Sequence, residues 1–242
     1  MKTTAIIVRN SFLAYLRQIS QDYMLVAAVF APLLAGLLIH FGAPFAETLL
    51  TKQFHKDAIL SPYYKVADLL LAMVTPLMIG FISAMVMLDE KDDRIISYLS
   101  VTPLGKKGYL ISRLLIPSIV ATIIGFILCI LFKISTLTVG NLAIISFYTA
   151  LLGIIICLFI VNMSSNKVEG MAIGKLSGIM LLGIFVPFFI TSSVQYLAVI
   201  LPSFFIGKYV TTGQGAWLAV GVVITILWII LFYRQFTKHS FY

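Results

Sequence analysis

Residues 66–88 read VADLLLAMVTPLMIGFISAMVML, and this stretch decides the class of fold. It exceeds the roughly 20 mostly apolar residues that a helix needs to cross the hydrocarbon core of a bilayer. Its one charged residue, Asp68, lies close to its beginning. The whole chain has the same character, because 61% of its 242 residues are hydrophobic and 11% are charged. A soluble core cannot absorb so much apolar surface, so we predict a protein that folds in lipid.

Five further segments resemble this stretch, which gives six predicted membrane spans. The predicted spans are 24–41, 66–88, 112–132, 141–161, 171–190 and 216–233. A seventh apolar segment, 194–206, is interrupted by Pro202 and is too short to cross, so we expect a re-entrant or interfacial segment before the last span. The polar stretches between spans are too short to fold alone. Residues 1–242 are therefore predicted to form a single all-α transmembrane domain, with the six spans between residues 24 and 233.

Residues 1–23 mix apolar side chains with Arg9 and Arg17. Such a mixture is typical of an amphipathic helix that lies on the membrane surface, with arginines near the lipid head groups. The alternative is a cytosolic extension of the first span. We favour the interfacial helix.

The distribution of lysine and arginine predicts the orientation. Cytoplasmic segments of membrane proteins collect positive charge. With both termini in the cytoplasm, the inner segments hold twelve of the 17 basic residues: Lys2, Arg9, Arg17, Lys91, Arg94, Lys106, Lys107, Arg113, Lys167, Lys175, Arg234 and Lys238. The same rule explains the net charge of +8 without nucleic acid. We therefore predict a multi-pass protein of the cell membrane with both termini inside, in contact with the lipid bilayer.

Residues that would support catalysis or ion coupling are missing from the sequence. The three histidines are scattered, and no metal-ligand spacing occurs among Cys, His and the carboxylates. Asp68, Lys175 and Arg113 lie at span ends, where we expect them to snorkel or to face water, so no titratable group is expected deep in the membrane. The segment from Gly170 to Gly174 and Lys175 is one residue short of a phosphate-binding loop and lacks its hydroxyl.

Three glycines at four-residue spacing, Gly170, Gly174 and Gly178, have a different interpretation. Small residues at this spacing allow two membrane helices to approach closely. We therefore predict that these glycines form a helix-packing face.

Residues 88–113, LDEKDDRIISYLSVTPLGKKGYLISR, carry most of the charge between spans. We expect Asp89 to cap a short cytosolic helix with Glu90 in its first turn, where acidic side chains suit the helix dipole. Ile95, Ile96 and Leu99 would form an apolar stripe along this helix. Such a helix could fit a groove on a partner protein. The alternative is an ordinary solvated loop.

This segment resembles the cytosolic loop of type-2 ATP-binding-cassette (ABC) exporter permeases. Glu90 stands at the acidic position of that loop, Leu99 matches its leucine, and 102–104 match its final Thr-Pro-Leu element. Arg94 stands where many members have glycine, and 95–96 replace a Thr-Leu pair. The charged run and the later Val-Thr-Pro-Leu are similar to permeases of fluoroquinolone or multidrug export.

The resemblance implies a non-catalytic membrane subunit that moves a drug, antibiotic, peptide or lipid with ATP hydrolysed on separate ATPase subunits. ATP and magnesium would bind to those subunits, and a second copy or a sister permease would complete the transporter. It also implies that 89–113 form the coupling loop. The residues expected to couple to the ATPase are Glu90, Asp92, Asp93, Arg94, Ile95, Leu99, Thr102, Pro103 and Leu104. An ion-coupled carrier or channel, and a non-transporting immunity or assembly protein, are the alternatives.

Overall fold

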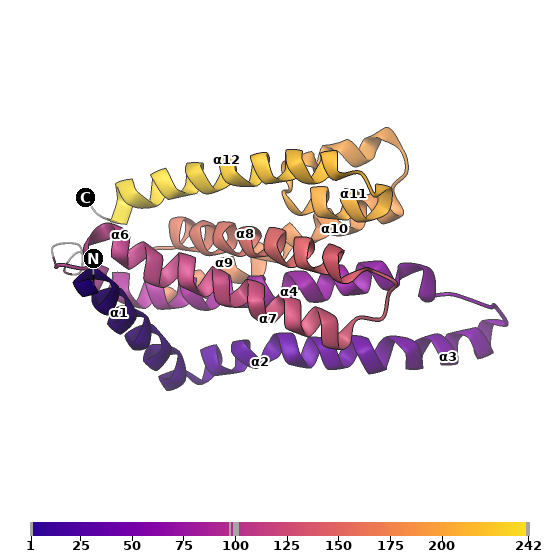
Figure 1. Ribbon diagram of the computed structural model, residues 1–242, viewed down its shortest axis with the longest axis horizontal. Coiled ribbons are helices and arrows are strands. Elements are labelled where there is room, and N and C mark those ends of the chain that lie inside the picture. The colour runs from indigo at the N-terminus through magenta and orange to yellow at the C-terminus, as the bar shows by residue number, and fades with distance from the viewer. Residues whose placement is uncertain (1, 97, 99–101, 241–242) are drawn as a thin grey trace.

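The computed structural model of the chain describes residues 2–96, 98 and 102–240. The described residues form a bundle of helices that run roughly along one long axis (Figure 1). The helices are α1 (Lys2–Gln21), α2 (Tyr23–Leu37), α3 (Ala43–Phe54), α4 (Tyr64–Asp92), α6 (Gly105–Leu110), α7 (Ile116–Phe132), α8 (Val139–Met163), α9 (Lys167–Ser177), α10 (Ile179–Phe189), α11 (Ser203–Thr212) and α12 (Gly215–Ser240). Single π-helical turns, Leu38–Gly42 and Ile111–Leu115, join α2 to α3 and α6 to α7.

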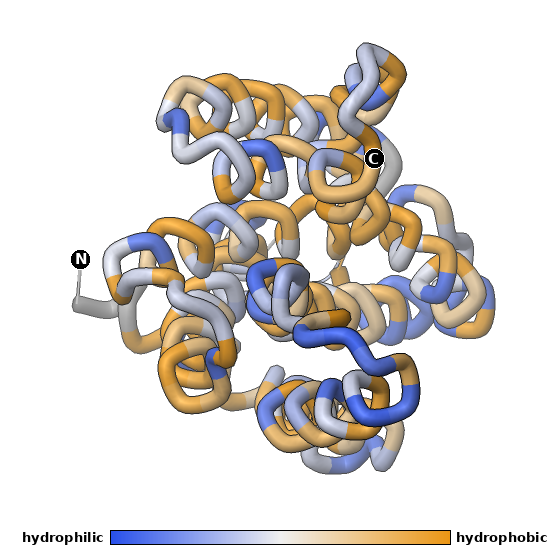
Figure 2. Tube along the Cα trace, turned by 90° about the vertical axis from the view of Figure 1, so that its right-hand side faces the viewer, coloured by the Kyte–Doolittle hydropathy of each residue, from blue (hydrophilic) through white to orange (hydrophobic). Residues whose placement is uncertain are grey.

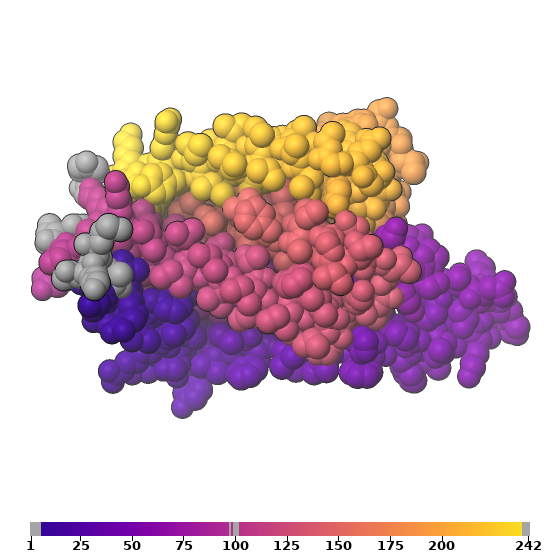
Figure 3. Space-filling view, in the orientation of Figure 1, coloured from indigo at the N-terminus to yellow at the C-terminus, as the bar shows by residue number. Residues whose placement is uncertain are grey.

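Six continuous helical stretches of the described chain are long and apolar enough to cross a membrane, which confirms the predicted spans. They are Tyr23–Phe54, Ser61–Asp92, Gly105–Phe132, Val139–Met163, Lys167–Phe189 and Gly215–Lys238. The first stretch is longer than predicted, because α3 continues from α2 through the π-helical turn. Together with the start of α4, this helix projects beyond the rest of the bundle (Figure 3).

The second and fourth spans, α4 and α8, form the centre of the bundle. In each, 72% of the most apolar segment is buried, against 17–28% in the other four spans. Two glycines bring the helix backbones into contact, since a Cβ atom on Gly80 would lie 2.4 Å from the carbonyl oxygen of Gly153. A Cβ atom on Gly153 would in turn lie 2.7 Å from the carbonyl oxygen of Pro76. Small residues therefore set the spacing of the central pair.

The remaining spans surround this pair and expose apolar side chains. Large exposed hydrophobic residues occur along α2, α7 and α12. Seen along the bundle axis, hydrophobic colour predominates on the surrounding helices and much of the hydrophilic colour lies in connecting segments (Figure 2). An apolar exterior is the expected surface of a bundle whose solvent is lipid.

The segment before the last span doubles back along α10. After α10 the chain forms a 3₁₀ helix, Ser193–Ile200, and then α11 begins at Ser203. The Ser203 hydroxyl donates a hydrogen bond to the carbonyl of Met180, near the start of α10. Farther along, a Cβ atom on Gly207 would lie 2.6 Å from the carbonyl oxygen of Ile184. The chain therefore returns to the beginning of α10 and runs beside it again, which is the geometry of a re-entrant segment.

Both chain ends lie at one end of the bundle, together with α1, α6 and the α4–α6 connection (Figure 1). We call this the inner end, following the predicted orientation, and the opposite end the outer end. α1 forms the predicted N-terminal helix and stops at Asp22. The Asp22 carboxylate caps α2 by accepting hydrogen bonds from the backbone N–H groups of Met24 at 2.9 Å and Leu25 at 3.3 Å. The cap lets the chain change direction between α1 and α2.

Candidate functional site

The α4–α6 connection begins differently from the prediction. α4 continues to Asp92 and has Asp93 as its C-cap, so the predicted capping role of Asp89 and the predicted first-turn position of Glu90 are wrong. Both residues lie in the last turns of α4. Arg94 then adopts a left-handed backbone conformation with φ of 59°, which ends the helix.

The middle of the connection is only partly described. Ile95, Ile96 and Tyr98 are helical, whereas Leu99 lies outside the described residues. Gly105, with φ of 63°, is the first residue of α6 and takes a conformation that suits glycine.

Charged and apolar residues of the connection face different surroundings. Asp92, Asp93, Arg94 and Pro103 are exposed, and Ile95 and Thr102 are half-buried. Ile96 and Leu104 are buried in the core of the same chain, with 2% and 7% exposure. Part of the predicted apolar stripe therefore anchors the connection to its own bundle, while the charged residues remain available at the surface.

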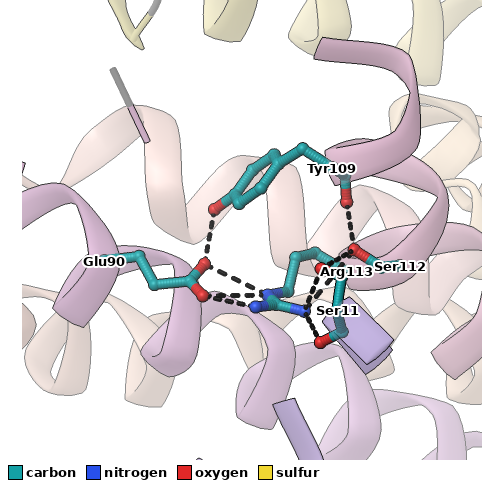
Figure 4. A network of polar contacts seen from close by, with 5 residues as sticks. All are labelled: Ser11, Glu90, Tyr109, Ser112 and Arg113. Atoms are coloured by element: carbon teal, nitrogen blue, oxygen red, sulfur yellow. Dashed lines mark hydrogen bonds and ion pairs between the residues drawn. The ribbon is translucent and has the colours of Figure 1, made fainter. Parts of the chain in front are cut away.

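Below the connection lies a buried ion pair between Glu90 and Arg113, whose side chains are both 2% exposed. The Arg113 Nε atom lies 3.1 Å from each carboxylate oxygen of Glu90, and Nη2 donates a second bond to Oε1 (Figure 4). The Tyr109 hydroxyl donates to the other oxygen, Oε2, at 2.8 Å. The pair thus joins the inner end of α4 to α6 and to the π-helical turn that follows it.

This placement corrects the expectation that Arg113 snorkels or faces water. Glu90 likewise points into the bundle and not toward a partner protein. Asp68, at the outer end, is also buried, and its carboxylate accepts hydrogen bonds from the backbone N–H groups of Ile134 and Ser135, each at 3.0 Å. All three charged groups are held by the protein itself.

The same network holds α1 against the bundle. The Arg113 Nη1 atom donates a hydrogen bond to the backbone carbonyl of Ser11 at 2.8 Å (Figure 4). One turn farther along α1, the Tyr15 hydroxyl lies 2.9 Å from the hydroxyl of Ser83 on α4. The Arg113 guanidinium also lies 5.4 Å from the centre of the Tyr15 ring, within the range of a cation–π contact. α1, α4 and α6 are therefore connected through one arginine.

A second polar contact joins three inner segments, and we call it the Lys167 clasp. The Lys167 ammonium lies 2.8 Å from Asp22, at the α1–α2 joint, and 2.7 Å from Asp89, near the end of α4. The Lys167 backbone N–H also donates to Asp92 at 3.2 Å. The hydrogen bond from Lys167 holds the pKa of the Asp22 carboxyl below its ordinary value. Sequence reasoning missed this clasp, because its three members lie far apart along the chain.

Two of the three predicted helix-packing glycines lie against another helix, and the third does not. A Cβ atom on Gly170 would lie 2.3 Å from a methyl group of Leu88, and one on Gly174 would lie 2.5 Å from the Phe81 ring, so both glycines admit side chains of α4. Gly178 has no such neighbour, since its contact is the carbonyl of Lys175 on its own helix. It lies instead at the joint between α9 and α10.

The charged groups at the inner end pair with one another across helices. Within the described residues, no group of three His, Cys, Asp or Glu side chains could hold a metal ion. The Glu90–Arg113 pair and the Lys167 clasp join the ends of neighbouring helices. They give the exposed connection a rigid base.

Six apolar spans with both termini and a charged, firmly based connection at one end define a multi-pass helical membrane protein. Residues 15–233 match the family model described as fluoroquinolones export permease protein Rv2686c-like, and the chain belongs to this family. The predicted resemblance to fluoroquinolone export permeases is thereby confirmed.

Two relatives are the fluoroquinolones export permease proteins of Mycobacterium tuberculosis strains CDC 1551/Oshkosh and ATCC 25618/H37Rv. Each is 25% identical to this chain over 237 residues, and the match covers 91% of this chain and 90% of the relative. The chain is therefore similar over nearly its whole length to permeases, which supports a transport subunit.

Proposed function

We propose that the chain is the transmembrane subunit of an ABC exporter, and that it moves an amphipathic compound with ATP hydrolysed by separate ATPase subunits. Two permease chains, identical or sister, would combine with two ATPases. The family match supports the permease role, and the names of the relatives make fluoroquinolone-like drugs the first substrate class to test.

The observation that carries the proposal is the exposed α4–α6 connection on its buried base. A force applied at Asp93 or Arg94 reaches the end of α4 directly. We expect the Glu90–Arg113 pair to pass this force to α6 and α7, because Glu90 bonds the end of α4 to α6 and to the π-helical turn before α7, and a buried pair is costly to break. An ATPase bound at this connection would therefore move two spans and α1 together.

The orientation belongs to the same proposal, since ATP is available in the cytoplasm. We propose that the inner end is cytosolic. Single cysteines at Arg94 and Lys56, both exposed at opposite ends, test this by labelling intact cells with an impermeant thiol reagent. Native Cys129 and Cys157 are buried, so their background is low. Labelling at position 56 with protection at 94 is expected, and the reverse result would overturn the orientation.

The ATPase contact is tested by co-purification of the tagged chain with its ATPase and by ATP-dependent drug uptake into inverted vesicles. Arg94→Glu reverses an exposed charge on the connection, and Leu99→Asp places a charge in the predicted apolar stripe. Both are expected to reduce ATPase recovery and transport in parallel. The matched control, Lys52→Glu, reverses an exposed charge on α3 at the outer end and is expected to change neither.

Two results would contradict the proposal. One is normal ATPase recovery and transport in both connection variants. The other is robust transport by the purified chain in a proton gradient without ATP, which would indicate an ion-coupled carrier.

A further inference from the structure

Between α2, α4 and the α9–α10 pair lies an apolar cleft of about 750 Å³. This volume is within the range of pockets that hold drug-sized molecules, about 300–1,000 Å³. Its walls carry three methionines, Met24, Met78 and Met171, together with the Phe81 ring. Methionine side chains are flexible and polarisable, so they can adapt to ligands of different shape.

Lys175 gives this cleft a chemical preference. Of the described residues that line it, Lys175 alone carries a charge. Its ammonium has no hydrogen-bond or ion-pair partner in the part of the chain that the structure describes, unlike Lys167 at the start of the same helix. Lys175 lies eight positions after Lys167 in the sequence, which places it about 12 Å farther along the helix from the inner end.

The aromatic wall lies next to this charge. Gly174 has no side chain, and a Cβ atom there would lie 2.5 Å from the Phe81 ring. The ring therefore packs directly on the α9 backbone, one residue from Lys175. A ligand with a carboxylate on a flat aromatic ring could contact the Phe81 ring and the Lys175 ammonium at the same time.

The Lys167 clasp lies at the inner mouth of the cleft. Asp22 comes two residues before the lining residue Met24, and Lys167 directly precedes the lining residue Val168. Both carboxylates at the mouth, Asp22 and Asp89, are already bonded to the Lys167 ammonium.

From this arrangement we propose that the cleft binds an aromatic amphipathic carboxylic acid and that Lys175 is the residue that recognises its carboxylate. The proposal rests on the proposed function, because it names the substrate class of the same exporter. A carboxylate and an ammonium form a charge-assisted hydrogen bond. The Lys175 side chain is exposed at the wall of the cleft, so the carboxylate of a bound ligand can reach it.

The test uses the full chain in nanodiscs of phosphatidylcholine, which carry no net charge, with empty nanodiscs as the blank. The probes are ciprofloxacin, which carries an aromatic carboxylate, and its ethyl ester, which lacks that charge. Binding is followed by the polarisation of the quinolone fluorescence. The wild-type chain is expected to bind the acid more tightly than the ester.

Three variants test whether the preference for the acid arises from Lys175 and whether both probes bind in the cleft. Lys175→Met is expected to weaken acid binding about tenfold or more, the loss of one hydrogen bond to a charged group, and to leave ester binding unchanged. Lys175→Arg keeps the charge and is expected to retain the preference for the acid. Ala172→Phe, at an exposed position in the cleft wall, is expected to weaken acid and ester equally by filling the cleft.

The control Lys52→Met removes a lysine on α3, outside the cleft, and is expected to behave as wild type. Equal binding of acid and ester by the wild-type chain would overturn the proposal. So would unchanged acid binding in Lys175→Met, or unchanged binding of both probes in Ala172→Phe. A loss of co-purifying anionic lipid from Lys175→Met with unchanged drug binding would assign Lys175 to lipid head groups and would also overturn it.

This test separates the two proposals. ATP-driven export by a chain without the acid preference would contradict the cleft assignment alone. A Lys175-dependent acid preference in a chain that recovers no ATPase would contradict the exporter alone.

Discussion

Removal of Arg113 is expected to have the largest effect on stability among the charged residues at the inner end. In Arg113→Met, the Glu90 carboxylate stays buried and loses its three hydrogen bonds from the guanidinium, while it keeps the hydrogen bond from the Tyr109 hydroxyl on α6. Breaking a buried ion pair in this way costs about 3–5 kcal/mol. The bond to the Ser11 carbonyl is lost as well, so α1 is expected to loosen.

The double variant Glu90→Met/Arg113→Met separates this penalty from simple loss of packing. It removes both charges and leaves side chains of comparable length, and such replacements are often neutral or stabilising. We therefore expect it to regain most of the stability that Arg113→Met loses. Since the two segments are then no longer joined by charge, transport is expected to stay low while the fold recovers.

The assay is thermal unfolding of the purified chain in detergent, followed by the midpoint temperature. For a chain of this size, 3–5 kcal/mol corresponds to a decrease on the order of 10 °C. Arg94→Met is the matched control, because Arg94 is exposed, and a surface substitution of this kind usually changes stability by less than about 0.5 kcal/mol. A double variant as unstable as Arg113→Met, or an unchanged midpoint in Arg113→Met, would refute the reasoning.

Two other predictions concern the Lys167 clasp and the central helix pair. Asn caps a helix as well as Asp does, so Asp22→Asn removes the charge that binds Lys167 and is expected to lower the unfolding midpoint at neutral pH. Because Lys167 lowers the pKa of Asp22, this stabilisation is complete above the ordinary carboxyl pKa, and the difference from wild type disappears as the pH falls through the folded-state pKa. Gly80→Ala forces a Cβ atom against the Gly153 carbonyl and is expected to cost about 1–3 kcal/mol in the same thermal assay. Gly125→Ala, whose Cβ would meet ordinary contacts of 3.5 Å or more, is expected to be nearly neutral, and equal effects of the two glycine changes would contradict the packing argument.

The spans could be predicted from sequence because hydropathy is a local property of each segment. The inner end could not, because its residues act over long distances. Acidic side chains are unfavourable near a helix C-terminus, so local rules place Asp89 and Glu90 at the start of a new helix. The structure places them at the end of α4, where Lys167 and Arg113 compensate their charge from 78 and 23 residues away.

The glycine face and the re-entrant segment also separate what a local sequence pattern can predict from what depends on tertiary packing. Spacing alone identified Gly170 and Gly174 as small positions, and both lie against side chains of α4. It could not show that the helix is interrupted at Gly178, since that break depends on where α10 packs. The interruption at Pro202 indicated a segment that does not cross, and the contact of Ser203 with Met180 adds the direction in which it returns.

The contact between Gly80 and Gly153 also has a use in spectroscopy. Two helices whose backbones touch cannot approach further, and here Gly80 meets the Gly153 backbone while Gly153 meets Pro76. α4 and α8 therefore provide a fixed internal reference for distance measurements between paramagnetic labels. Against a label pair on these two helices, a change in distance to α2, α9 or α12 during an ATP cycle reports movement of that helix relative to the central pair.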